Sequence, residues 1–176
     1  VGSLVEYDWA ASLLSEIAPL RPTTRCCQAK VRAFHETARL AGELGLVLAW
    51  ARPFFVYGPG EPEGRLIGDL VRGLRAGREV ACTDGLQQRD YLFVDDLARG
   101  LALLLDSPLA GAVNIASGNA IAVRDLITEV ARQIGRTDLV RLGARPRPQG
   151  DPERLCADVT LAMAALAFRP AFSLAE

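Results

Sequence analysis

Lysine and histidine are almost absent from this sequence, which contains one of each, Lys30 and His35. Arginine supplies the other cationic side chains, and the formal net charge is −1. No basic field therefore favours nucleic acid or an anionic membrane as a partner. The single lysine indicates that an ammonium is needed at position 30, although an arginine-favouring composition would also leave few lysines by chance. A lone histidine has no ligand partners at useful spacing, so we interpret His35 as a surface or packing residue and expect no metal site.

The sequence predicts neither disulfides nor membrane-spanning helices. The four cysteines, at positions 26, 27, 82 and 156, form neither a secreted disulfide framework nor a zinc-binding spacing. Reduced thiols are typical of cytosolic proteins. No apolar run is long enough to cross a bilayer, and the first residues lack the basic region of a signal peptide. We therefore expect a soluble, cytoplasmic protein.

Composition indicates a globular chain. Of its 176 residues, 50% are hydrophobic and 23% are charged, which is enough apolar material for a sizeable core. This length predicts one domain, or one domain with a fragment of another.

The longest predicted helix runs from Thr24 to Leu44, with Thr23 or Thr24 as its N-cap and Gly45 at its end. Small apolar residues cover much of its surface, which would let a second helix approach closely. Cys26 and Lys30 are four residues apart and share one helical face. We predict a helical dimer interface on this element.

Strands alternate with helices along the rest of the chain. The sequence predicts buried strands at residues 46–51, 80–83, 89–94 and 113–116, and the end of another strand at residues 1–7. It predicts helices at 65–76, from Asp95 or Asp96 to 105, at 123–134 and, more weakly, at 160–166, with Asp95 or Asp96 as a helix cap rather than a metal or acid–base pair. This order indicates an α/β fold with a mainly parallel sheet. Residues 54–60 are expected to form a loop at the carboxyl end of the strand, where such sheets bind ligands.

Five segments together resemble the C-terminal half of one enzyme family. They are Ser3 to Tyr7, Pro22 to Lys30, Arg52 to Gly60, Arg89 to Asp96 and Asn114 to Gly118. Their order is similar to that in the extended short-chain dehydrogenase/reductases, the NAD(P)-dependent epimerases, dehydratases and ketoreductases of nucleotide sugars. The resemblance implies the C-terminal part of a Rossmann-like parallel sheet in residues 1–60. Residues 61–176 would then form mainly a small α/β substrate-binding region.

The resemblance implies NAD or NADP as cofactor. The family holds the dinucleotide pyrophosphate on a glycine-rich turn, and this sequence contains no such turn. Gly58-Pro59-Gly60 does not replace it, because proline lacks the central N–H donor. The cofactor contacts that remain are Lys30, with the nicotinamide ribose, and Pro53 and Phe55, near the nicotinamide at the exit of the strand.

The family's proton-transfer residues are a Ser or Thr, a Tyr and a Lys. Ser3 matches the first position and Lys30 the last, but Cys26 occupies the tyrosine position. A neighbouring ammonium would favour a thiolate, so a cysteine acting as acid and base is one alternative. Its side chain is shorter than tyrosine by most of a ring, and we therefore favour a degenerate or altered site.

The substrate side of the resemblance is more complete. It implies that Arg89 contacts the diphosphate of a nucleotide sugar, with Arg147 as a second phosphate ligand. Arg65 would lie near phosphate, Leu66 near the base, and Asn119 would add an amide contact. Phe55 replaces an Asn that usually touches the diphosphate. Two hypotheses follow: an incomplete nucleotide-sugar epimerase, dehydratase or ketoreductase, or a non-catalytic module that binds a nucleotide sugar or dimerises.

Overall fold

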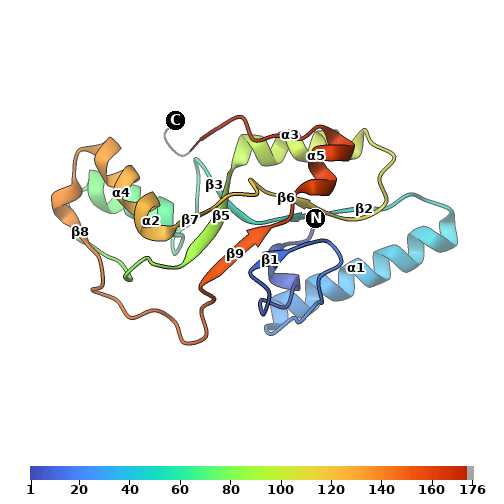
Figure 1. The fold of residues 1–176 in the computed structure, drawn as a ribbon, viewed down its shortest axis with the longest axis horizontal. Coiled ribbons are helices and arrows are strands. Elements are labelled where there is room, and N and C mark those ends of the chain that lie inside the picture. Colours follow the sequence, from blue (N-terminus) through green and yellow to red (C-terminus); the bar gives the residue numbers. More distant parts are fainter. Residues whose placement is uncertain (174–176) are drawn as a thin grey trace.

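The structure is a computed structural model, and it describes residues 1–173; the last three residues of the predicted 61–176 region lie outside it. Within this range the chain forms five α-helices, two 3-10 helices and nine strands (Figure 1). The helices are α1 (Arg25–Leu44), α2 (Leu66–Arg75), α3 (Val94–Leu105), α4 (Val123–Ile134) and α5 (Thr160–Leu166), with the 3-10 helices η1 (Leu4–Glu6) and η2 (Thr137–Leu139). The strands are β1 (Leu13–Leu14), β2 (Ala49–Pro53), β3 (Phe55–Tyr57), β4 (Val80–Ala81), β5 (Gln88–Phe93), β6 (Gly111–Ile115), β7 (Ala120–Ala122), β8 (Val140–Arg141) and β9 (Arg154–Ala157).

Most strand pairs are parallel, which confirms the predicted α/β fold. The largest sheet has the order β1-β9-β5-β3, and β7 pairs antiparallel with β5. Strands β2 and β6 form a second parallel pair, and β4 and β8 a third. Among the described residues, no helix is long and apolar enough to cross a bilayer.

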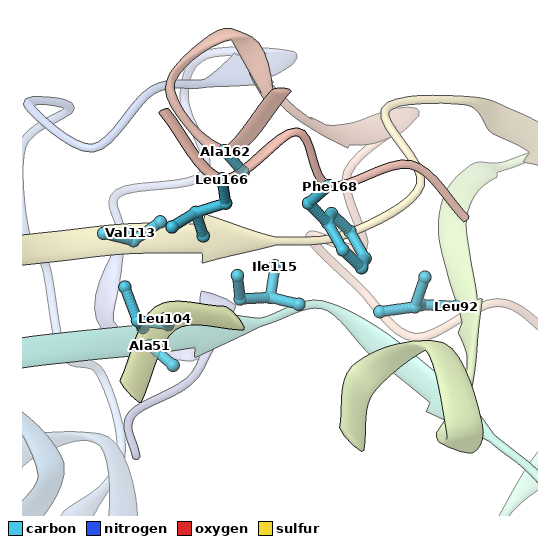
Figure 2. Packing of buried hydrophobic residues seen from close by; sticks show 8 residues of the cluster. All are labelled: Ala51, Leu92, Leu104, Val113, Ile115, Ala162, Leu166 and Phe168. Carbon is cyan, nitrogen blue, oxygen red and sulfur yellow. The ribbon is translucent and has the colours of Figure 1, made fainter. Parts of the chain in front are cut away.

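Helices cover β2 and β6 from opposite sides. In Figure 1, α3 and α5 lie above these strands and α1 lies below them. The core on the upper side contains Ala51, Ile115 and Phe168 among its buried residues (Figure 2). Side chains alternate along a strand, so Trp50 and Arg52 point to the opposite face of β2, toward α1. There the ring of Phe34 on α1 lies 5.4 Å from the ring of Trp50.

Helices α2 and α4 pack together at the far end of the molecule (Figure 1). Both present an apolar stripe, and their buried residues form one cluster with Cys82. Leu70, Leu74 and Ile127 are fully buried in it. The two helices therefore form one packed unit, and Tyr91 of β5 packs against it.

Three predicted elements were wrong in type or position. Residues 1–7 do not end a strand, because Ser3 and Glu6 form a capping box that turns the chain into η1. The strand predicted at 46–51 begins at Ala49, since its partner β6 begins opposite that residue and Leu46 and Val47 are exposed. The expected loop 54–60 contains β3, which forms because Phe55 pairs with Tyr91 of β5.

The helix caps were predicted with mixed success. Thr24 caps α1 as expected, and its hydroxyl accepts a hydrogen bond from the backbone N–H of Cys27. Gly45 ends the same helix in the left-handed region, at φ 66°. The prediction for Asp95 or Asp96 was wrong, because Phe93 occupies the N-cap of α3. Asp96 instead accepts hydrogen bonds from the backbone N–H groups of Ala171 and Phe172.

Candidate functional site

A cavity of about 610 Å³ opens beside β5, between η1 and the first turn of α2. One wall comes from η1 and from the junction of β2 and β3. The opposite wall comes from the loop before α2 and from Val123, the first residue of α4. The floor is β5 with the residue before it, where Gln87, Arg89 and Tyr91 alternate toward the cavity, as every second residue of an extended chain does.

The cavity brings together half of the residues that were predicted for the site. Ser3, Phe55, Arg65, Leu66 and Arg89 all line it. Five others are not among the described residues that form its lining: Cys26, Lys30, Pro53, Asn119 and Arg147.

Arg89 is the buried cation of the cavity, with 5% of its surface exposed. One guanidinium nitrogen forms an ion pair with Asp151, and another donates to the backbone oxygen of Gln88 at 2.8 Å. The guanidinium carbon lies 5.7 Å from the centre of the Phe55 ring, within the range of a cation–π contact. These contacts hold a forked donor at the cavity floor, where it is suited to a phosphate group.

Asp151 connects Arg89 with a second arginine. The Nε atom of Arg147 lies 3.9 Å from the Asp151 carboxylate, and its Nη1 donates to Glu153 at 3.0 Å. Arg147 therefore stands behind Asp151, outside the cavity lining. Asn119 is exposed on the turn after β6, where its backbone N–H donates to the Ser117 hydroxyl.

Aromatic rings form the side of the cavity next to Arg89. The rings of Phe55 and Tyr91 both line it and lie 5.7 Å apart, and the ring of Tyr57, which lines a separate cavity, lies 6.4 Å from that of Tyr91. Burial raises the pKa of the Tyr91 hydroxyl to about 12, so this group is a neutral donor and acceptor at physiological pH. Arg89 opposes the shift without cancelling it.

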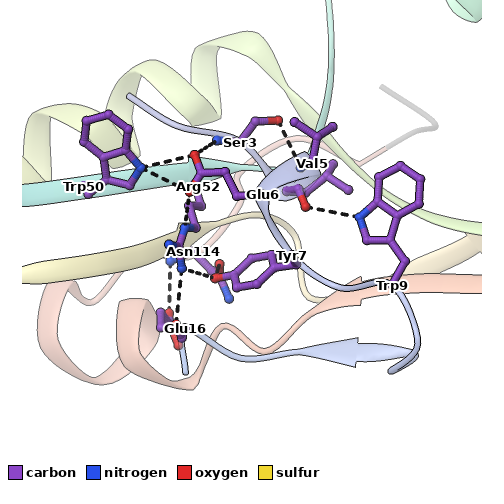
Figure 3. Close-up of polar contacts among 10 residues, drawn as sticks. Ser3, Val5, Glu6, Tyr7, Trp9, Glu16, Trp50, Arg52 and Asn114 are labelled. Atoms are coloured by element: carbon purple, nitrogen blue, oxygen red, sulfur yellow. Dashed lines mark hydrogen bonds and ion pairs between the residues drawn. The ribbon is translucent and has the colours of Figure 1, made fainter. Parts of the chain in front are cut away.

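Ser3, the N-cap of η1, lines the cavity. Figure 3 shows the polar contacts that hold its backbone in place. Its N–H donates to the Glu6 carboxylate at 2.9 Å. Glu6 is completely buried and also accepts from the Trp50 indole at 3.2 Å and from Arg52 Nε at 2.7 Å. The position of Ser3 therefore depends on a carboxylate that is anchored to β2.

Arg52 extends this network along the same face of β2. Its Nη1 donates to the Tyr7 hydroxyl at 3.1 Å and to the Glu16 backbone oxygen at 3.2 Å. The Tyr7 hydroxyl donates in turn to the Asn114 side chain at 2.8 Å. Burial raises the pKa of Tyr7, so it stays protonated as this chain of donors requires. The Arg52 guanidinium also lies 5.2 Å from the centre of the Phe34 ring on α1. The Arg52 side chain therefore ties η1, β6 and α1 together.

Cys26 and Lys30 lie on α1, outside the cavity. Cys26 is exposed, while the next residue, Cys27, is buried and its sulfur accepts from the Thr24 hydroxyl at 2.9 Å. Lys30 is partly buried, one turn before Phe34. Within residues 1–173, no hydrogen bond or ion pair involves the Lys30 ammonium. Pro53, the last residue of β2, pairs with Ile115.

Sequence reasoning missed four polar or aromatic residues that line the cavity: Glu61, Gln87, Tyr91 and Asp151. A signal for two of them was available, because Gln87 and Tyr91 lie two residues on either side of Arg89 in an extended segment. Asp151 is distant in the sequence, and only the fold brings it to Arg89.

Comparisons with known proteins agree with this architecture. The sequence profile of the NAD dependent epimerase/dehydratase family matches residues 1–116. A dTDP-4-dehydro-6-deoxy-D-allose reductase of Streptomyces bikiniensis is 33% identical over 139 residues, which are 76% of this chain and 42% of that protein. This chain thus spans less than half of that relative's length.

Solved structures give the same result. A UDP-glucose 4-epimerase of Thermotoga maritima, solved with UDP-glucose, superposes with a TM-score of 0.88 at 26% identity, over 99% of this chain and 57% of that one. MoeE5, solved with UDP-glucuronic acid and NAD, gives a TM-score of 0.86 at 29% identity, over 99% of this chain and 60% of that one. The profile match covers more than half of the sequence, and the fold and the order of the segments agree with it. The chain belongs to the NAD-dependent epimerase/dehydratase family.

Proposed function

We propose that this chain holds the nucleotide-diphosphate sugar of an NAD(P)-dependent nucleotide-sugar epimerase, dehydratase or reductase. The observation that carries the proposal is Arg89, a buried cation at the floor of a cavity large enough for a small ligand. Burying a charge is costly unless it is paired, and Asp151 offers only one carboxylate to a guanidinium with five N–H donors. A diphosphate would engage the remaining donors. Arg65, at the N-cap of α2, would add a second positive charge from the opposite wall.

The sugar would lie toward Ser3. A hydroxyl at that position orients a sugar hydroxyl or carbonyl by hydrogen bonding, and Glu6 fixes the backbone that carries it. Phe54 and Phe55 exclude water from the same end of the cavity.

The cofactor of the proposed enzyme is NAD or NADP, since MoeE5 was solved with NAD. When bound, its nicotinamide supplies a hydride acceptor and donor. Lys30 fits the nicotinamide end, because its ammonium forms no bond to any residue in the described part of the chain. Pro53 and Phe55 flank the strand exit nearby. The sequence contains no glycine-rich turn for the pyrophosphate, so the residues of this chain fit only one end of the cofactor.

Proton transfer in the proposed enzyme is altered at Cys26. The thiol is exposed on α1 and outside the cavity lining. It is too short to reach a substrate that is held for a phenol. We therefore propose that the 176-residue chain binds nucleotide sugars but neither binds NAD tightly nor turns over.

A second proposed role is that of a non-catalytic module that binds a nucleotide sugar or dimerises. It is favoured by the exposure of α1, in which only Cys27 and Ala41 of its 20 residues are buried. A homodimer through this helix would cover the remainder. Sedimentation of the chain at increasing concentration separates a dimerising module from a monomeric binding domain.

Ligand binding tests the main proposal. Thermal shift and isothermal titration with UDP-, dTDP-, CDP- and GDP-sugars should show stabilisation by at least one of them and none by NAD alone. Hydrogen bonds to charged groups contribute about 1.5–3 kcal/mol, so Arg89→Met should weaken binding about 10- to 100-fold. Arg89→Lys should retain part of the affinity, and Arg78→Met, an exposed arginine, serves as the matched control. No stabilisation by any of the four sugars, or tight NAD binding, would contradict the proposal.

A further inference from the structure

Gln87 is an unsatisfied polar residue in the cavity. Seven polar or charged side chains are buried among the described residues: Glu6, Arg52, Gln87, Arg89, Asp90, Asp96 and Asn114. Six of them form side-chain hydrogen bonds or ion pairs. The exception is Gln87, which is 8% exposed and whose Oε1 atom has no hydrogen-bond partner among residues 1–173. A buried amide without a partner destabilises the folded protein, so its retention calls for a reason.

Among residues 1–173, no hydrogen bond holds the Gln87 side chain to the fold. The backbone oxygen of Gln87 accepts a hydrogen bond from Val123 N–H at 2.9 Å, and this contact joins the residue before β5 to the first residue of α4 whatever side chain is present. The adjacent glutamine provides a contrast. Gln88 points to the other side of the strand, is exposed, and accepts from Arg154 Nε at 3.2 Å.

Gln87 occupies a defined place relative to Arg89. The two residues are two positions apart in an extended segment, so their Cα atoms are about 6.6 Å from each other. Tyr91 and its partner Phe55 lie on the other side of Arg89, toward Ser3. On the Gln87 side, Val123 is hydrogen-bonded to the Gln87 backbone, and the apolar side chains of Leu66 and Ile67 line the same cavity. A diphosphate on Arg89 therefore has the sugar end of its ligand toward Ser3 and the nucleoside end toward Gln87.

A flat heteroaromatic base matches such a subsite. Apolar side chains would cover the two faces of the base. The edge of the base carries a hydrogen-bond donor next to an acceptor, and the oxygen and NH₂ group of a carboxamide complement this pair. The terminal torsion of glutamine is broad and roughly two-fold, so rotation presents either group to the ligand. We propose that Gln87 is a specificity-determining residue that hydrogen-bonds the polar edge of the nucleobase. This inference rests on the proposed function, because it requires the diphosphate to lie on Arg89.

The test compares Gln87→Met with the matched control Gln88→Met. Titrations use UDP, dTDP, CDP, GDP and inorganic pyrophosphate, which carries no base. Gln87→Met should weaken the best nucleoside diphosphate about 10-fold and leave pyrophosphate binding unchanged, whereas Arg89→Met should weaken both. Because Gln87→Met removes a buried unpaired group, it should also raise the Tm of the free protein by about 2–4 °C. Gln88→Met should leave all affinities at the wild-type level.

A ligand variant gives a second readout that does not depend on folding of the mutant. Methylation of the ring N–H at position 3 of UDP should weaken binding to the wild-type chain by the same factor, and should add no further loss in Gln87→Met. Equal binding of a nucleoside diphosphate by Gln87→Met and wild type would overturn the role of Gln87 while leaving the proposed function intact. Failure of every nucleoside diphosphate to bind the wild type would overturn both.

Discussion

Glu6 and Arg52 form an ion pair with almost no access to solvent, at 0% and 2% side-chain exposure. A buried pair is not by itself a strong source of stability, because both charges were removed from water to make it. Here the desolvated groups have further partners. The Trp50 indole and the Ser3 N–H donate to Glu6, and Arg52 reaches Tyr7 and Glu16. Removing one charge would leave the other buried and unpaired.

We therefore predict that Glu6→Gln lowers the free energy of unfolding by about 3–5 kcal/mol. Urea unfolding, followed by circular dichroism, measures the change. The matched control is Glu36→Gln in the exposed pair with Arg39, where more than half of each side chain is open to solvent and the loss should stay below about 1 kcal/mol. A loss in Glu6→Gln as small as in the control would mean that the network tolerates a missing charge.

Elements with a strong local signal were predicted well, and elements that depend on distant partners were not. Helix α1 has a capping threonine, a long helical pattern and a terminal glycine, and its predicted limits agree with the structure. The two-residue strands β1 and β8 carry no such signal, because only pairing with a remote strand defines them. At η1 the local signal was misleading. The apolar residues there predicted a strand, whereas a capping box between Ser3 and Glu6 stabilises a 3-10 helix.

Two helical glycines allow the packing of elements to be tested. A Cβ added to Gly42 on α1 meets no described heavy atom within 4 Å, so Gly42→Ala should raise the free energy of unfolding by about 0.5–1 kcal/mol. A Cβ on Gly100 of α3 would lie 2.7 Å from Ile115 Cγ2 and 3.1 Å from the Phe168 ring, both in the core of Figure 2. Gly100→Ala should therefore lower it by about 1–2 kcal/mol, because overpacking outweighs the helix propensity of alanine. In thermal unfolding, Gly42→Ala should therefore raise the Tm and Gly100→Ala should lower it. A rise in Tm for both variants would contradict the close approach of α3 to β6.

The candidate site is a property of the whole molecule, because its residues come from six separate stretches of sequence. Arg89 and Ser3 were predicted from the ordered segments of the family resemblance, and Arg65 and Leu66 from the likeness of residues 63–67 to another part of that family. Asp151 is 62 positions from Arg89 along the chain, and no local pattern connects the two. Gln87 was missed for a different reason. Its position two residues before Arg89 indicates which side of the extended segment it faces, but an unsatisfied side chain is recognised only when its surroundings are known.

Helix α1 has few buried residues for its length of 20 residues. Its contacts are concentrated at Cys27, Phe34 and Ala41, while Leu40 and Leu44 are 46% and 68% exposed. Segments with few buried contacts open at lower free energy than the core does.

We predict that hydrogen exchange, measured by mass spectrometry at low micromolar protein, is faster in α1 than in α4, whose apolar stripe is packed against α2. If a second copy covers α1, its exchange should slow as protein concentration rises while that of α4 stays constant. Leu44→Glu should abolish this dependence, because a charge would then have to be buried in the interface. Equal protection of α1 and α4 in dilute protein would show that contacts within one chain already suffice to hold the helix.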